Sequence, residues 1–432
     1  MMNGLRLTGL VLLLMLSARL SFAQYYEYPF PISHYDFVNY DSSRIEYPGG
    51  EGALDRFYQR LSEVVLEGKG QVNIVQIGGS HIQADMMSGE LRTRFQSFEG
   101  GQNAGRGFVF PYRLARTNTP FGYHFEYSGK WSTCRNVEKK RVCRLGMAGI
   151  SAYTTDSAAS LAVCFEPEND IKYRFNALKV YHDTGPDAFA VQIDSNLLDT
   201  LWVDTLGGFT QIVLKDYLDS LGMRFVKTDS LQNGFMLYGM NLETDEPGIV
   251  FHNLGINGAA TTSFLRCQLL SAQLATLKPD LVILGLGIND AYGRNFSQRE
   301  YERNYEQLVG EIRKANPDVC ILYTTNNDSY IRRRYLNRNG IKVQQSMKRL
   351  AKKQDAALWD MFEVMGGLNS IVRWQRYGLA KADRIHFTRP GYLLMGDLIF
   401  DALIRDFGDY LQRQYDSAEQ ANLLNPKNGN RR

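Results

Sequence analysis

The chain has 432 residues, which is enough for about two domains with a full hydrophobic core. Its 49 Lys and Arg residues nearly balance its 46 Asp and Glu residues, so we expect no field that attracts polyanions and no nucleic-acid partner. Hydrophobic residues make up 44% of the chain and aromatic residues 12%, which indicates a globular protein rather than a disordered one.

The first residues have the pattern of an export signal. A basic residue, Arg6, precedes an apolar run (7–16), and small residues follow at the two positions that a signal peptidase reads. We therefore expect a signal peptide over residues 1–23, no membrane span, and an exported protein that is periplasmic or secreted. Cys134 and Cys143 flank a charged segment, and a disulfide between them would suit an oxidising compartment, although the sequence leaves this pairing open.

A candidate nucleophile follows the first predicted strand. The short apolar run Asn73–Ile77 predicts a buried parallel strand, and it ends at Gly78 and Gly79 with Ser80 on the turn before a helix. Open α/β folds bind ligands at this edge of the sheet, and the start of a helix can hold an anion. Ser80 is therefore placed to attack a carbonyl carbon. A serine that only caps the following helix is an equally good interpretation of this stretch alone.

The pattern changes over residues 115–245. Short alternating segments recur there between Gly, Asp, Asn and Ser residues, which predicts a β-sandwich inserted into an α/β domain. Both ends of the insert return near strands whose carboxyl ends carry Ser80 and Gly258, so we expect the insert at the rim of the active site. Its aromatic side chains either stack on sugar rings or form the sandwich core. These include Trp131, Tyr153, Tyr173, Tyr181 and Trp202.

Strands and helices alternate again after the insert, which predicts a parallel sheet covered on both faces. The expected strands are Leu281–Leu284, Val319–Tyr323 and Ala357–Trp359, and the expected helices are Gln298–Ala315, Ile341–Gln354 and Gly391–Leu411. The fold class is therefore α/β with an inserted all-β domain. We expect the α/β domain to comprise residues 24–114 and 246–416, followed by a disordered tail over residues 417–432.

Three further motifs occur near predicted strands of the second part. They are Asn253–Gly258, Gly285–Asp290 and Asp383–His386. Together with Ser80 they place Ser, Gly, Asn and Asp-x-x-His in a chain order that resembles the SGNH (GDSL) hydrolase superfamily. The resemblance implies a three-layer α/β/α fold and a metal-independent serine esterase without a cofactor.

Ester cleavage through serine needs a nucleophile, a base, a partner for the base and donors for the oxyanion. The motifs assign these roles to Ser80, His386 and Asp383, with the amides of Ser80 and Gly258 and the side chain of Asn289 as oxyanion donors. A histidine on a loop can also be structural, and an asparagine at a strand end can also cap a helix. We find no Cys/His spacing typical of a zinc site.

Finer features resemble the peptidoglycan O-acetylesterases of this superfamily. They are the Gly78–His81 opening, the inserted β-domain and the Asp-x-x-His pair followed by Phe387. This resemblance implies an O-acetylated glycan as partner, peptidoglycan first, and an insert like a carbohydrate-binding module. The chain departs from the family at Gly79, where Asp is usual. An acetylesterase for another polysaccharide, an SGNH acetyltransferase, and a non-catalytic glycan-binding protein on an esterase scaffold stay open as alternatives.

Overall fold

The computed structural model describes residues 30–98, 102–140, 143–167, 171–293 and 295–424. They form two compact units, of which the first comprises residues 32–406 and the second residues 30–31 and 407–424. The predicted signal peptide (1–23) and residues 425–432 of the predicted tail lie outside the described residues. None of the helices in these ranges combines the length and apolar character needed to cross a membrane.

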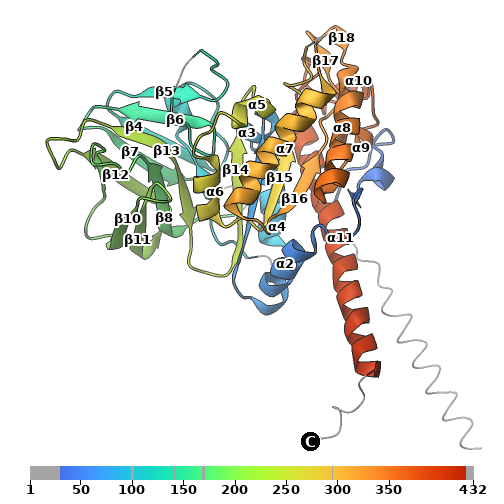
Figure 1. The fold of residues 1–432 in the computed structure, drawn as a ribbon, viewed down its shortest axis with the longest axis horizontal. Coiled ribbons are helices and arrows are strands. Elements are labelled where there is room, and N and C mark those ends of the chain that lie inside the picture. Colours follow the sequence, from blue (N-terminus) through green and yellow to red (C-terminus); the bar gives the residue numbers. More distant parts are fainter. Residues whose placement is uncertain (1–29, 99–101, 141–142, 168–170, 294, 425–432) are drawn as a thin grey trace, which may run out of the picture. The chain divides into compact units, whose positions relative to one another are not determined.

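A six-stranded, mainly parallel sheet organises part of the first unit (Figure 1). In spatial order its strands are β1 (Ile45–Glu46), β19 (Ala357–Trp359), β16 (Cys320–Thr324), β15 (Leu281–Gly285), β2 (Gln71–Gly78) and β14 (Gly248–Gly255). The edge strand β1 runs antiparallel to β19, and the other neighbours pair in parallel. The inner strands are largely apolar because helices cover both faces of the sheet.

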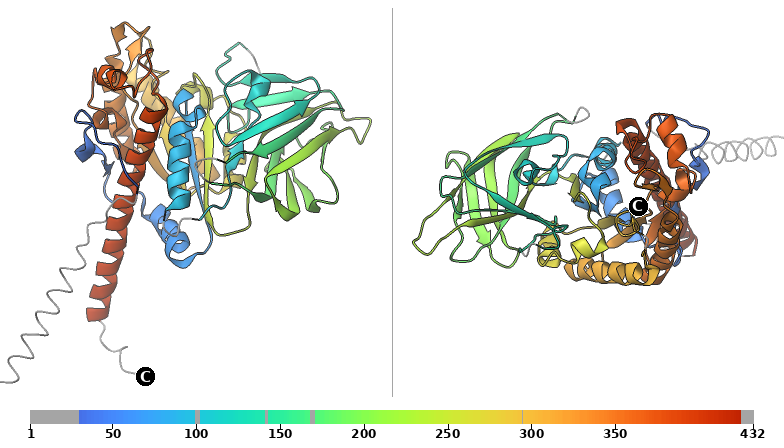
Figure 2. Two further views of the ribbon diagram at one scale, coloured as in Figure 1. Left: turned by 180° about the vertical axis from the view of Figure 1, so that it is seen from behind. Right: turned by 90° about the horizontal axis from the view of Figure 1, so that it is seen from above.

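The helices of the α/β part are α2 (Asp55–Glu67), α3 (Ser80–Gln83), α4 (Met86–Ser97), α5 (Thr261–Phe264), α6 (Leu270–Leu277), α7 (Gln298–Ala315), α8 (Asn339–Gln354), α9 (Met361–Val364), α10 (Ile371–Arg376) and α11 (Arg389–Leu424). α6, α7 and α8 lie side by side on one face of the sheet, and α4 and the first part of α11 cover the other (Figures 1 and 2). On that second face the ring of Phe95 meets Phe57 of α2 and Phe400 of α11 edge to face. The layers are those of the predicted α/β/α fold.

The insert consists of two antiparallel sheets. The larger contains β10 (Leu198–Asp204), β11 (Phe209–Leu218), β8 (Phe175–His182), β13 (Phe235–Glu243), β6 (Ile150–Thr154) and β5 (Ser132–Arg135), and the smaller contains β4 (Tyr123–Ser128), β7 (Ser160–Phe165), β12 (Ser220–Val226) and β9 (Ala190–Gln192). Aromatic rings join the two sheets: Phe225 stacks on Phe235 with centroids 4.1 Å apart, and Phe165 meets Phe175 edge to face. The insert is therefore a sandwich, as predicted. A 3₁₀ turn, η2 (Tyr112–Ala115), leads into it, and η1 (Tyr40–Ser42) and the β17–β18 hairpin (Tyr330–Ile331, Tyr335–Leu336) complete the elements.

Two boundaries differ from the prediction. β3 (Gly107–Val109) pairs with β13 in the larger sheet of the insert, so the insert contributes a strand before residue 115. β3 was not predicted because its three residues are too few to show the alternation of polar and apolar side chains that is typical of a strand. α11 continues to Leu424, where a disordered tail from residue 417 was expected, because residues 417–424 are mostly good helix formers and the next proline is Pro426.

The structure also joins Cys134 and Cys143 in a disulfide.

Candidate active site

Ser80 lies at the carboxyl end of β2, a central strand of the parallel sheet. The strand ends at Gly78, where a Cβ atom would lie 2.4 Å from Cγ1 of Ile82 and 3.1 Å from the carbonyl oxygen of Gly285. Glycine at this point lets the chain turn sharply into α3, whose first residue is Ser80. The turn leaves the Ser80 side chain partly exposed at the edge of the sheet.

Ser80, His386 and Asp383 form a continuous series of hydrogen bonds. Ser80 Oγ lies 2.8 Å from Nε2 of His386, and Nδ1 of His386 lies 2.8 Å from Oδ2 of Asp383. Oδ1 of Asp383 also accepts the backbone N–H groups of Ile385 at 2.9 Å and of His386 at 3.0 Å. The structure thus brings together the predicted nucleophile, base and partner of the base, although Ser80 and His386 are 306 residues apart in the chain.

The Asp383 carboxylate is held in its ionised form. Burial acts to raise the pKa of Asp383, but hydrogen bonds from the backbone and ring of His386 and from the Ile385 amide outweigh burial and keep this pKa below its usual value. An ionised Asp383 favours the His386 tautomer with its proton on Nδ1. Nε2 is then the acceptor that faces the Ser80 hydroxyl.

A second histidine lies beside the base and stays neutral. The ring centroids of His81 and His386 are 5.2 Å apart, and Nδ1 of His81 lies 2.8 Å from the hydroxyl of Tyr392. Burial, and after it the charge of His386, lowers the pKa of His81 to about 3. His81 therefore adds no second positive charge beside the base at neutral pH.

The predicted oxyanion donors lie on two neighbouring loops. Asn289 is exposed after β15, and its Nδ2 donates to the carbonyl oxygen of Ala259 at 2.9 Å, which leaves the second N–H of the amide for a ligand. Gly258 precedes Ala259 in a turn with a φ of 81°, a conformation that favours glycine. A Cβ atom at position 79 would lie 3.3 Å from Nδ2 of Asn289, so the family departure at Gly79 is directly beside a predicted donor.

Two pockets meet at Ser80. The first, which we call the inner pocket, is lined by Gly79, Ser80, Ala259, Leu286, Asn289 and Phe387, among others. The second, which we call the rim pocket, is lined by Ser80, Ala84, Met86, Asn118, Thr119, Phe121, Asn257, Lys381, His386 and Tyr392. Residues 118, 119 and 121 belong to the predicted insert, so the insert contributes to the lining of the rim pocket.

Sequence reasoning missed the polar network that ties the insert to the site. Nε2 of Gln83, in the last position of α3, donates to Oγ1 of Thr117 and to the carbonyl oxygen of Asn118, each at 2.9 Å. Oε1 of Gln83 accepts the backbone N–H of Asn257 at 2.6 Å, and Nδ2 of Asn257 donates to Oδ1 of Asn118 at 2.6 Å. No local pattern in the sequence marks residues that meet only in the folded chain. Among these residues, only Asn257 lies within a motif that the sequence analysis had identified, Asn253–Gly258.

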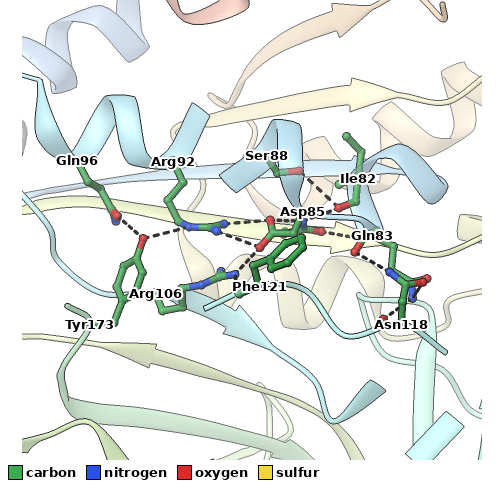
Figure 3. Close-up of polar contacts among 12 residues, drawn as sticks. Ile82, Gln83, Asp85, Ser88, Arg92, Gln96, Arg106, Asn118, Phe121 and Tyr173 are labelled. Carbon is green, nitrogen blue, oxygen red and sulfur yellow. Dashed lines mark hydrogen bonds and ion pairs between the residues drawn. The ribbon is translucent and has the colours of Figure 1, made fainter. Parts of the chain in front are cut away.

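A second polar cluster lies below this network (Figure 3). The fully buried carboxylate of Asp85 binds Arg92 at 2.9 Å, pairs with Arg106, and accepts Nδ2 of Asn253 at 2.7 Å. Arg92 also donates to the hydroxyl of Tyr173, which belongs to the insert. Burial acts to raise the pKa of Asp85, but the two guanidinium groups and Asn253 outweigh burial and lower it. This cluster joins α4 to the insert and has no exposed side chain for chemistry.

The aromatic residues named as sugar-stacking candidates differ in exposure. Tyr173 and Tyr181 are buried, and their hydroxyls bind Gln96 and Thr276, so they belong to the core. Trp131 and Tyr153 are partly buried, and Trp202 is exposed. Within the described ranges, no group of three or more His, Cys, Asp and Glu side chains is arranged to hold a metal ion.

Comparison with known proteins agrees with this geometry. Residues 228–394 match the GDSL-like Lipase/Acylhydrolase family, a stretch that includes Gly258, Asn289, Asp383 and His386. Ser80 lies outside the match, on the far side of the insert. No curated protein matches the chain.

One solved structure shows the same fold over most of the chain. A peptidoglycan O-acetylesterase superposes with a TM-score of 0.71 at 23% identity, covering 84% of this chain and 99% of the other. A lipase/acylhydrolase from Enterococcus faecalis (TM-score 0.30, 24% identity) covers 36% of this chain and 75% of its own. An acetyl xylan esterase (TM-score 0.28, 17% identity) covers 36% and 80%.

Proposed function

We propose that the chain is a carboxylic-ester hydrolase that removes O-acetyl groups from a glycan, with peptidoglycan as the favoured substrate. The match of residues 228–394 to the GDSL-like Lipase/Acylhydrolase family supports this proposal. The hydrogen-bonded series Ser80–His386–Asp383 carries this proposal. It supplies a hydroxyl, a base facing that hydroxyl, and an anion that orients the base, which are the groups that acyl transfer through serine requires.

The reaction follows from the positions of these groups. His386 Nε2 takes the Ser80 proton as Oγ bonds to the acetyl carbon, and the carbonyl oxygen becomes an oxyanion that the amide N–H groups and Asn289 stabilise. The bond from carbon to the glycan oxygen then breaks, and that oxygen takes the proton from His386. An acetyl group remains on Ser80. Water attacks it with His386 again as base, and acetate leaves.

Two features support a glycan as the substrate. The similarity to a peptidoglycan O-acetylesterase extends over almost the whole of that protein, including its counterpart of the insert. The insert also places Asn118, Thr119 and Phe121 in the pocket that holds His386. A site built from two domains suits a polymer, because the second domain can hold the chain near the nucleophile and raise its effective concentration.

Acetate release from O-acetylated peptidoglycan and from acetylated xylan, measured with purified protein and no added metal, tests the proposal. We expect faster release from peptidoglycan and none in Ser80→Ala. Release from xylan alone would move the substrate to another polysaccharide, and transfer of the acetyl group to an added sugar would identify a transferase. Binding without acetate release from any ester would identify a glycan-binding protein.

We further propose that the protein is exported after cleavage of residues 1–23 and acts in the periplasm or outside the cell. The Arg6 and 7–16 pattern supports this location. The mass of the protein recovered from cell fractions tests it. A mature chain beginning at Gln24 is expected, and a full-length chain confined to the cytoplasm would contradict the proposal.

A further inference from the structure

The mechanism constrains which pocket holds which half of the ester. The leaving oxygen must come within hydrogen-bonding reach of His386 Nε2, because this atom returns the proton to it. The oxyanion must instead face Asn289. His386 lines the rim pocket and Asn289 lines the inner pocket, while Ser80 lines both. The two halves of an ester bound at Ser80 are therefore directed to different pockets.

We propose that the rim pocket is the subsite for the sugar ring whose oxygen leaves, and that Phe121 of the insert is its specificity-determining wall. This inference rests on the proposed function and adds to it the place and the contacts of the sugar. In the transfer step, the bond from Ser80 Oγ to the acetyl carbon forms, the bond from that carbon to the sugar oxygen breaks, and the sugar oxygen gains the proton from His386. The acetyl group then occupies the inner pocket.

The chemistry of the lining suits a carbohydrate. The Phe121 ring is 45% exposed, with the Arg389 guanidinium 5.4 Å from its centroid, and its remaining exposed surface offers an apolar contact for a sugar ring. The side-chain amides of Asn118 and Asn257 offer donors and acceptors for hydroxyl or acetamido groups. Apart from His386, Lys381 is the charged side chain in this lining, which includes no carboxylate among the described residues. The pocket therefore suits a neutral or acidic sugar rather than one with a free amine.

The wall is held in place before a ligand arrives. Gln83 and Asn257 bind the chain at Thr117 and Asn118, as described above, and Arg106 donates to the carbonyl oxygen of Phe121 at 3.1 Å. A loop fixed in this way loses little further entropy when it meets a ligand, which favours binding. The same contacts hold the backbone that carries Phe121 beside the pocket at Ser80, so the subsite can distinguish one leaving alcohol from another.

Phe121→Ala and Tyr127→Ala form a matched pair of variants. Tyr127 is also an aromatic residue of the insert, 48% exposed, but it lines a different hollow over the smaller sheet. The rate constant kcat/KM is measured for soluble O-acetylated peptidoglycan fragments and for ethyl acetate, whose leaving group is too small to reach Phe121. We expect Phe121→Ala to lower the ratio of the two by about two- to tenfold, the range of one aromatic contact. Phe121→Tyr should keep the ratio, and so should Tyr127→Ala.

An unchanged ratio in folded Phe121→Ala, or an equal drop in Tyr127→Ala, would overturn the subsite. A second measurement separates this failure from failure of the proposed function. Fragments without acetyl groups should inhibit ethyl acetate hydrolysis competitively, and Phe121→Ala should weaken that inhibition. Inhibition that depends on Phe121 without acetate release from peptidoglycan would refute the proposed substrate and keep the subsite. Acetate release that does not depend on Phe121 would refute the subsite and keep the function.

Discussion

Two polar clusters, one around Ser80 and the other around Asp85, are built in opposite ways. At the sheet edge, the side chains of His386 and Asp383 are 31% and 28% exposed, and the hydroxyl of Ser80 faces a base. Below it, Asp85 and Arg92 are 0% exposed, and each binds several partners. The first cluster keeps access to solvent and substrate, whereas the second has none.

This difference in exposure distinguishes charged side chains that can take part in chemistry from charged side chains that only stabilise the fold. Charged side chains in the interior are stable only when hydrogen-bond and ion-pair partners surround them. The atoms of such groups that could bind a substrate are then already occupied. A reactive group must instead lie within reach of the substrate. Asp383 is partly exposed and binds the ring that faces Ser80, which supports its proposed role beside the base, whereas the buried contacts of Asp85 belong to the joint between the two domains.

Removing the nucleophile should have the largest effect. Ser80→Ala and His386→Ala should each lower kcat by about 10⁴- to 10⁶-fold, because the members of such a series act as a unit. Hydrolysis of a small aryl acetate measures this loss, with Ser195→Ala, an exposed serine of the insert, as control. Unfolding temperatures should match the wild type. Retained turnover in Ser80→Ala would end the esterase assignment.

Breaking the buried cluster should cost stability instead of chemistry. Asp85→Asn leaves Arg92 and Arg106 without their anion, and we expect a loss of about 3–5 kcal/mol in the free energy of unfolding. Urea unfolding measures it, and Asp199→Asn, an exposed carboxylate, should change little. Because the pKa of Asp85 is lowered in the folded state, its contribution is present at neutral pH and is lost as the pH falls below about 4. A stable variant with reduced turnover would reverse our assignment.

Asn289→Ala should reduce kcat by about 10²- to 10³-fold, the usual cost of one oxyanion donor. KM should change much less, because the oxyanion exists only in the transition state. The side chain is exposed, so the fold should be kept, and Asn196→Ala serves as an exposed control. A raised KM with unchanged kcat would make Asn289 a substrate contact.

The smallest effect that we expect is the dependence of turnover on pH, which tests the groups of the exposed cluster. With the pKa of Asp383 lowered and that of His81 near 3, both groups keep their charge state around neutral pH. Turnover should therefore rise with pH in one step, as the base loses its proton. Initial rates on a small ester between acidic and neutral pH measure this. A flat profile would argue against a histidine base, and two steps would show that a second group titrates.

Sequence reasoning named Ser80 and Asn289 because each follows a strand with a strong local pattern, and it named Asp383 and His386 from their spacing and the family resemblance. The apolar run before Ser80 and the helical period of Gln298–Ala315 are visible within a few residues, and the latter helix has the predicted bounds. Whether Ser80 or Asn289 acts in chemistry or only caps a helix did not follow from these patterns. The assembled hydrogen bonds of Ser80 favour the former.

The joint between the domains could not be predicted. Gln83, Asn118 and Tyr173 acquire their roles through contacts across the fold, and polar side chains buried in this way look like surface residues in a sequence. β10 was missed for a related reason: its side chains are mostly exposed, so it lacks the alternation of a half-buried strand. The three-residue β3 is defined by its pairing with β13, which lies more than 100 residues later.

The single turn of α3 has a consequence for engineering. Its first residue is the predicted nucleophile, Ser80, and its last residue, Gln83, binds Thr117 of the insert. We therefore expect that the insert cannot be replaced without disturbing the site. A linker spliced in its place would remove Tyr173, to which Arg92 donates, and Thr117 and Asn118, which the side chain of Asn257 binds next to the predicted oxyanion loop. A chimera between relatives should place its crossover points outside residues 106–121 and 173–243. Recombination would then move the insert together with the residues that it contributes to the rim pocket, which are Asn118, Thr119 and Phe121.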